Sequence, residues 1–82
     1  MGKDIAVLRT VLKGYSKADV LARLDEINSV ILVYEQGGMT KAEALAAIDS
    51  AAEKPIKTAF SGFDKEQVTE YIAELRRRTE NG

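Results

Sequence analysis

The side chains best able to do acid–base chemistry are carboxylates, because the chain has no His and no Cys. It therefore lacks the commonest general base near neutral pH and the commonest metal ligand. Two pairs, Asp25 with Glu26 and Glu70 with Glu74, could be imagined as a general acid and its base. Both pairs fall between apolar stripes, on faces that we expect to be solvated. The sequence therefore predicts no catalytic residue, no metal site and no cofactor site.

Basic side chains near the C-terminus are the second candidate. Arg76–Arg78 could contact phosphates, but arginines at a helix end also match the negative end of the helix dipole. Gly37-Gly38 lacks the following Lys-Ser/Thr that a phosphate-binding loop requires. The Ala- and Glu-rich stretch after it has Lys41 as its only base, whereas a recognition helix exposes Arg, Lys, Asn or Gln. We do not expect a nucleic-acid partner, and a small helical DNA-binding regulator of phage or plasmid type is the alternative function.

The composition is that of one small folded domain spanning residues 1–82. Hydrophobic residues make up 45% of the 82, charged residues 30%, and the net charge is −1. A chain this short holds one modest core. The longest apolar run, Val30–Tyr34, is far below the ~20 residues that span a bilayer, and the N-terminus has no secretory signal. We expect a cytoplasmic protein.

Apolar periodicity predicts helices at residues 4–13, 16–36, 41–53 and 65–79, which would form an all-α bundle with a central helical hairpin. In the first of these, apolar residues recur at steps of three and four, and Gly14 supplies a left-handed stop. Thr40 and Glu43 have the spacing of a capping box, and Pro55 ends the third helix.

One pattern occurs twice, 48 residues apart: "GYSKADVLARLDEI" at 14–27 and "GFDKEQVTEYIAEL" at 62–75. Each copy has Gly, an aromatic, a capping residue, an acid or amide three residues later, and Val at the fourth helical position. An aromatic before the cap that packs on the fourth helical residue is a hydrophobic staple, and the Gly permits a sharp turn. Asp19 and Gln67 are expected to complete a capping box in each copy. These helix-start motifs comprise Gly14, Tyr15, Ser16 and Val20, and Gly62, Phe63, Asp64 and Val68.

Two such helix starts could arise by chance, but the agreement extends further. Leu24 matches Ile72, and Ile27 matches Leu75. This extension favours a true repeat.

The second copy resembles a known family. "FSGFDKEQVTEYIAELRRR", Phe60 to Arg78, is similar to the N-terminal motif of DivIVA-like proteins, in which a Phe precedes a Gly-aromatic-Asp turn and a helix with spaced apolar residues. A looser match covers Leu12 to Ile27, with Ser16 in place of Asp. Together the two matches cover about half the chain.

The resemblance implies a bacterial cytoplasmic scaffold linked to cell division or polarity, self-associating and without catalysis. It also implies that an aromatic and a basic residue before the turn contact a membrane or a partner. Phe60 with Lys57 is the nearest equivalent, and Leu12 with Lys13 a poorer one. The chain departs from the family in having Ser61 where a basic residue adjoins the Gly, and in lacking a long coiled coil after the motif.

The helix predicted at 16–36 carries more apolar residues than one face needs. We expect it either to be covered internally or to form a homodimer seam. The candidate partner surface consists of Ile27, Val30, Ile31, Val33 and Tyr34.

Overall fold

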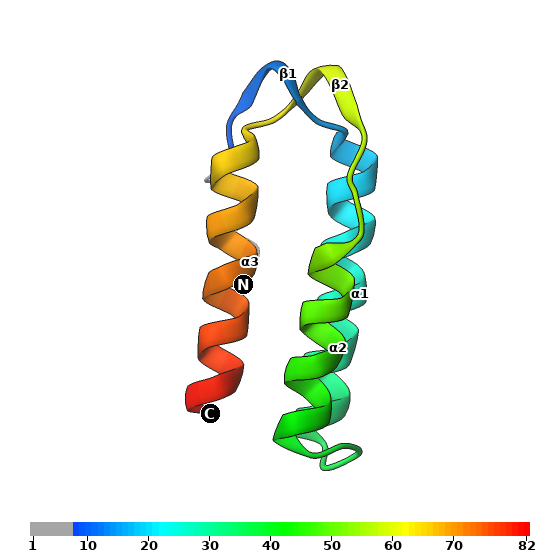
Figure 1. Cartoon of the computed structure of the whole chain (residues 1–82), viewed down its shortest axis with the longest axis vertical. Helices are drawn as coiled ribbons and strands as arrows, with labels where there is room; N and C mark the ends of the chain where they lie inside the picture. The colour runs from blue at the N-terminus through cyan, green and yellow to red at the C-terminus, as the bar shows by residue number, and fades with distance from the viewer. Residues whose placement is uncertain (1–7) are drawn as a thin grey trace.

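The structure is a computed structural model that describes residues 8–82 (Figure 1). Along this part the elements are β1 (Thr10–Tyr15), α1 (Lys17–Glu35), α2 (Lys41–Glu53), β2 (Thr58–Phe63) and α3 (Lys65–Asn81). The prediction of an all-α bundle of four helices is wrong. Residues 8–82 form three helices and a two-stranded sheet, which is a small α+β fold.

The error lies in the predicted helix at 4–13. Residues 10–13 belong to β1, and residues 4–7 lie outside the described part of the chain. Leu8 and Val11 have helical spacing, but the segment is held extended by backbone pairing with β2, 48 residues away. Local periodicity carries no information about such a distant partner, so tertiary pairing overrides it.

The two strands run antiparallel, because the paired residue numbers decrease along β2 as they increase along β1. Thr10 lies opposite Phe63, Leu12 opposite Ser61, and Tyr15 opposite Thr58. The ladder is irregular, since Tyr15 also approaches Phe63. In Figure 1 the strands arch over one end of the molecule and cross there, before α1 and α3 descend on either side.

The crossing depends on two buried glycines. A Cβ atom added to Gly14 would lie 2.3 Å from the carbonyl oxygen of Phe63, and one added to Gly62 would lie 2.2 Å from that of Tyr15. Real Cβ atoms do not approach backbone so closely. The glycine at the start of each motif is therefore required by the opposite strand. The periodicity suggested that Gly14 ends a helix, and this prediction is wrong, because Gly14 lies within β1.

The helix boundaries follow the sequence closely. Ser16 and Asp64 cap α1 and α3 by accepting from the N–H groups of Asp19 and of Gln67, respectively. The capping box predicted at Thr40 is present at the start of α2. α2 ends at Glu53, and Lys54 is extended, as the following Pro55 predicts.

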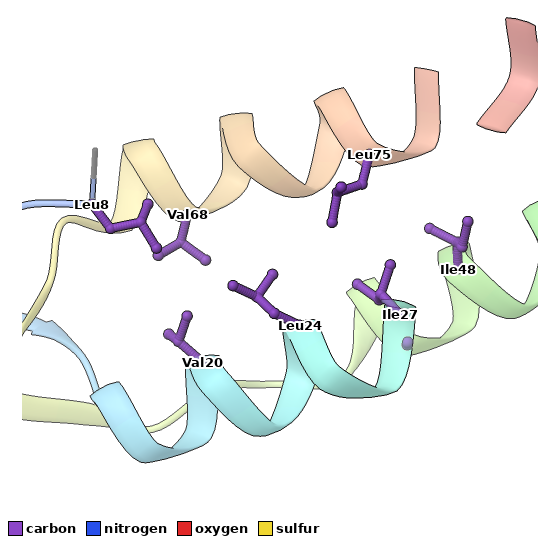
Figure 2. Packing of buried hydrophobic residues seen from close by; sticks show 8 residues of the cluster. Leu8, Val20, Leu24, Ile27, Ile48, Val68 and Leu75 are labelled. Carbon is purple, nitrogen blue, oxygen red and sulfur yellow. The ribbon is translucent and has the colours of Figure 1, made fainter. Parts of the chain in front are cut away.

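The core lies between α1 and α3 beneath the strands and extends onto α2. In Figure 2, Val20 and Leu24 of α1 point towards Val68 of α3, with Leu8 beside them. Val20, Ile27 and Ile48 are completely buried. The full cluster is Leu8, Val20, Leu24, Ile27, Ile48, Ala51, Val68 and Leu75.

Polar contacts join α2 to α3 and the loop after α2 to α1. Arg23 is buried and donates to the carbonyl oxygens of Lys54 (2.8 Å) and Pro55 (3.3 Å). Arg76 of α3 donates from Nε to Oδ1 of Asp49 on α2 at 2.7 Å, and this contact lowers the pKa of Asp49. Figure 1 shows that the α1–α2 turn and the C-terminus lie at the end of the molecule opposite the strands.

Candidate functional site

Two large apolar side chains are exposed where the strands arch over the end of the molecule. Phe60 is 78% exposed and Leu12 is 71% exposed. Leu12 lies opposite Ser61, the neighbour of Phe60, so the two side chains come from adjacent points of the crossed strands. We call Leu12, Lys13, Phe60 and Ser61 the strand tip. Two large apolar side chains exposed this fully at neighbouring positions of paired strands are a feature of contact surfaces.

Lys13 adopts a left-handed backbone conformation, with φ at 59°. The β-carbon of a residue other than Gly clashes with the backbone in the left-handed conformation, which therefore costs on the order of 1 kcal/mol. Across residues 8–82, Lys13 is the only non-glycine residue with positive φ. Strain of this kind is concentrated at functional sites, and here it occurs at an exposed Lys between Leu12 and Gly14.

Basic residues gather at the strand end of the molecule. Residues 8–17 and 54–65 hold six of the chain's 12 Lys and Arg residues but only one acid, Asp64. Five of these bases are exposed on or beside the strands: Arg9, Lys13, Lys17, Lys57 and Lys65. The near-neutral net charge of the whole chain therefore conceals a positive strand end.

The caps of α1 and α3 are completed across the sheet. Gln67 was expected to reach back to the N–H of its own cap, but its Oε1 accepts from the N–H of Arg9 at 2.7 Å. The N–H of Asp64 instead donates to the carbonyl oxygen of Arg9 at 2.8 Å. The start of α3 is thereby bonded to the residue just before β1, and Gln67 does not form the reciprocal half of the predicted capping box.

The start of α1 makes the equivalent hydrogen bonds to Lys57, which precedes β2. The N–H of Ser16 donates to the carbonyl oxygen of Lys57 at 2.7 Å. Oδ2 of Asp19 in turn accepts from the N–H of Lys57 at 3.4 Å. Ser16 and Asp64, Asp19 and Gln67, and Arg9 and Lys57 are each 48 residues apart, so each contact in one set has its equivalent in the other with the two halves exchanged. The two halves are therefore related by a pseudo-twofold.

The aromatic residues of the motifs obey the same relation. Nζ of Lys17 lies 5.5 Å from the ring centre of Phe63, and Nζ of Lys65 lies 5.3 Å from that of Tyr15. Both rings are half-buried and pack against the core. Contacts of an ammonium with an aromatic face at this distance are favourable.

Asp64 is the acid with the most varied set of contacts at this end. A hydrogen bond from the N–H of Gln67, with further bonds from Arg9 and the N–H of Glu66, lowers the pKa of Asp64 below its usual 3.8 despite partial burial. Nη2 of Arg9 lies 3.2 Å from its Oδ2. The carboxylate is therefore held ionised and fixed as a cap, with no proton to exchange near neutral pH.

The candidate partner surface on α1 is only partly accessible. Ile27 is completely buried, Val30, Ile31 and Tyr34 are half-buried, and Val33 is exposed. Ile31 and Tyr34 line a groove of about 560 Å³ between the ends of α1 and α3. Of the residues singled out for membrane or partner contact, Lys57 and Phe60 are both exposed.

Two features of the site were missed by reasoning from sequence. Arg23, which binds the loop before β2, sits on the core side of α1, where an arginine had no evident partner. The bonds of Asp19 and Gln67 to the opposite strand were also missed. Their common position, three residues after the cap in both motifs, is a signal, but it cannot distinguish a local partner from a distant one.

Comparison with known proteins adds no relative. No protein-family model matches the chain, and no curated protein and no solved structure matches it significantly. Among the described residues, no cluster of three acidic side chains could hold a metal ion. The helices found in residues 8–82 are all too short or too polar to cross a membrane.

Proposed function

We propose that this protein is a non-catalytic interaction module that attaches to an anionic membrane surface through its strand tip. The observation that carries the proposal is the exposure of Phe60 and Leu12 on the paired strands, with five exposed basic residues on or beside these strands. An apolar pair enters the acyl boundary of a bilayer, while the surrounding ammonium and guanidinium groups remain at the lipid phosphates.

The expected energies are sufficient for reversible attachment. Burying a Phe or Leu side chain contributes about 1.5–3 kcal/mol each. A basic residue close to an anionic leaflet adds about 1 kcal/mol. Together, two apolar side chains and several bases should give a dissociation constant in the micromolar range once the cost of association is subtracted.

The resemblance to DivIVA-like proteins supports the same role. The motif at Phe60 lacks the basic residue beside its Gly, where Ser61 stands. The antiparallel crossing places Leu12 and Lys13 of the first motif next to Phe60 and Ser61, so the opposite strand offers the missing base. We therefore propose a cytoplasmic scaffold of the kind associated with cell division or polarity, with a second copy of the chain as its expected protein partner.

Vesicle co-sedimentation tests the attachment. The wild-type chain should bind vesicles of phosphatidylglycerol and phosphatidylcholine mixed, and bind pure phosphatidylcholine much less. Phe60→Ala should weaken binding about tenfold or more, because a buried aromatic is lost. Leu12→Ala combined with Phe60→Ala should abolish it.

The matched control is Leu32→Ala, because Leu32 is 54% exposed but lies near the end of α1 away from the strands. It should bind vesicles like the wild type. Equal binding by Phe60→Ala and wild type would rule out the strand tip as the contact. Binding to random duplex DNA with a steep salt dependence, and none to vesicles, would favour the DNA-binding alternative.

A further inference from the structure

A second groove, of about 380 Å³, lies between α2 and α3, near the end of β1 and the start of β2. Its floor is apolar. Ile48 and Val68 are buried, and Tyr15, Ile56 and Ile72 are half-buried around them. A concave, mostly apolar surface with a few polar groups at its edge is typical of sites for small organic molecules.

Two small side chains keep this groove open. Ala52 of α2 and Ala73 of α3 both line it, and both are exposed. Because each side chain is a single methyl group, the apolar floor between the two helices remains accessible from solvent.

Four charged side chains line the groove, and three of them have a partner of opposite charge. Arg76 donates to both carboxylate oxygens of Asp49, at 2.7 and 3.2 Å. Nζ of Lys54 lies 2.9 Å from a carboxylate oxygen of Glu26. The fourth is Glu53, whose carboxylate makes no hydrogen bond or ion pair within residues 8–82. The edge of the groove at Glu53 is therefore negatively charged.

The position of Glu53 in α2 adds to this negative potential. Glu53 is the last residue of the helix, where carbonyl groups without helical partners form the negative end of the helix dipole. The last turn of α2 contains no basic residue. A carboxylate at this end is unfavourable, so a positive charge placed beside it is stabilised by both the side chain and the dipole.

We propose that this groove binds a small amphiphilic amine, a molecule with an apolar body and one primary ammonium group. The apolar body covers the floor, and the ammonium group lies at Glu53 and the carbonyl end of α2. An anionic ligand is disfavoured, because Arg76 is already bonded to Asp49 and the Glu53 carboxylate repels it. None of the strand-tip residues lines the groove, so this binding is separate from vesicle attachment.

Three probes that differ in one functional group test the charge preference in the full chain. They are phenethylamine, phenethyl alcohol and hydrocinnamate, titrated without lipid and followed by amide chemical shifts at Ala52, Ile56 and Ala73. We expect the amine to bind about two- to fivefold more tightly than the alcohol, as for an exposed ion pair, and the carboxylate to bind most weakly. The preference for the amine should shrink at an ionic strength of about 1 M, where charges are strongly screened.

Substitutions at the groove locate the site. Glu53→Gln should bind the amine no more tightly than the alcohol, with binding of the alcohol unchanged. Glu70→Gln is the matched control, because Glu70 is an exposed acid of α3 outside the groove, and it should retain the preference. Ala73→Leu should weaken binding of all three probes, because the larger side chain covers the apolar floor.

Three results would each overturn the proposal. One is the absence of saturable binding by any probe. The second is equal affinity for the amine, the alcohol and the carboxylate. The third is a preference for the amine that persists in Glu53→Gln. Since no lipid is present, these outcomes are independent of whether the strand tip binds vesicles.

Discussion

Lys13 combines backbone strain with a place beside the exposed Leu12. Its left-handed φ of 59° is better tolerated by Asn, whose short polar side chain bonds locally. We expect Lys13→Asn to raise the unfolding free energy by a few tenths of a kcal/mol, because the strain is partly relieved. The same change should weaken binding to anionic vesicles several-fold, since one charge is lost. Denaturant unfolding and vesicle co-sedimentation on one preparation would check both. A variant that loses stability without losing binding would contradict the assignment.

Asp64 gives the fold an acid-sensitive contact. Its pKa is lower in the folded chain than its usual 3.8, so its contribution to stability is complete at neutral pH and is lost as the pH falls through the lowered pKa. Asn is also a good cap but does not titrate in this range. We expect Asp64→Asn to be less stable than wild type at pH 7 and equally stable near pH 2. Thermal unfolding from pH 7 to pH 2 measures this. Parallel curves for the two proteins would show that Asp64 makes no such contribution.

Residues whose roles depend on near neighbours could be predicted from the sequence. Ser16, Thr40 and Asp64 were identified as caps because a capping side chain bonds within three residues. The exposure of Phe60 could not be decided in this way, because an aromatic before a turn is equally suited to a core. Phe60 is 78% exposed once β2 is paired with β1, a long-range pairing that the local sequence does not reveal.

Among the elements, the helices were predictable and the strands were not. α1, α2 and α3 carry their own caps and apolar stripes, so their bounds can be found locally. β1 and β2 are six residues each, and in residues 8–82 they pair only with one another. The glycines that make their crossing possible, Gly14 and Gly62, also suit a helix stop or a turn. A short strand paired with a distant one leaves little local pattern.

The bonds that complete the caps across the sheet couple each helix to the opposite strand. Gln67→Ala removes a 2.7 Å bond to the N–H of Arg9 and should cost about 0.5–1.5 kcal/mol of unfolding free energy. Asp19→Ala removes a bond of 3.4 Å to Lys57 and should cost less. Chemical denaturation of both single variants gives the comparison. If the caps were completed within each motif, Arg9 would show no change in amide exchange when Gln67 is replaced.

For the molecule as a whole, the repeated motif has a structural reason. Each copy of the motif packs against the other copy. The Gly, the aromatic residue, the capping residue and the Val must therefore occur in both copies for the two halves to make equivalent contacts. The sequence shows this recurrence plainly but gives no hint that the copies meet. The resulting molecule, about 40 Å in its longest dimension, has a basic, apolar end and a distant turn.

Both long helices leave the crossed strands in the same direction, with the C-terminus at the far end of α3 (Figure 1). The 17 residues of α3 rise by about 25 Å. A fluorophore attached at Gly82 is consequently held about that far from whatever the strands touch. Its quenching by probes at different bilayer depths would thus report whether the protein stands upright or lies flat.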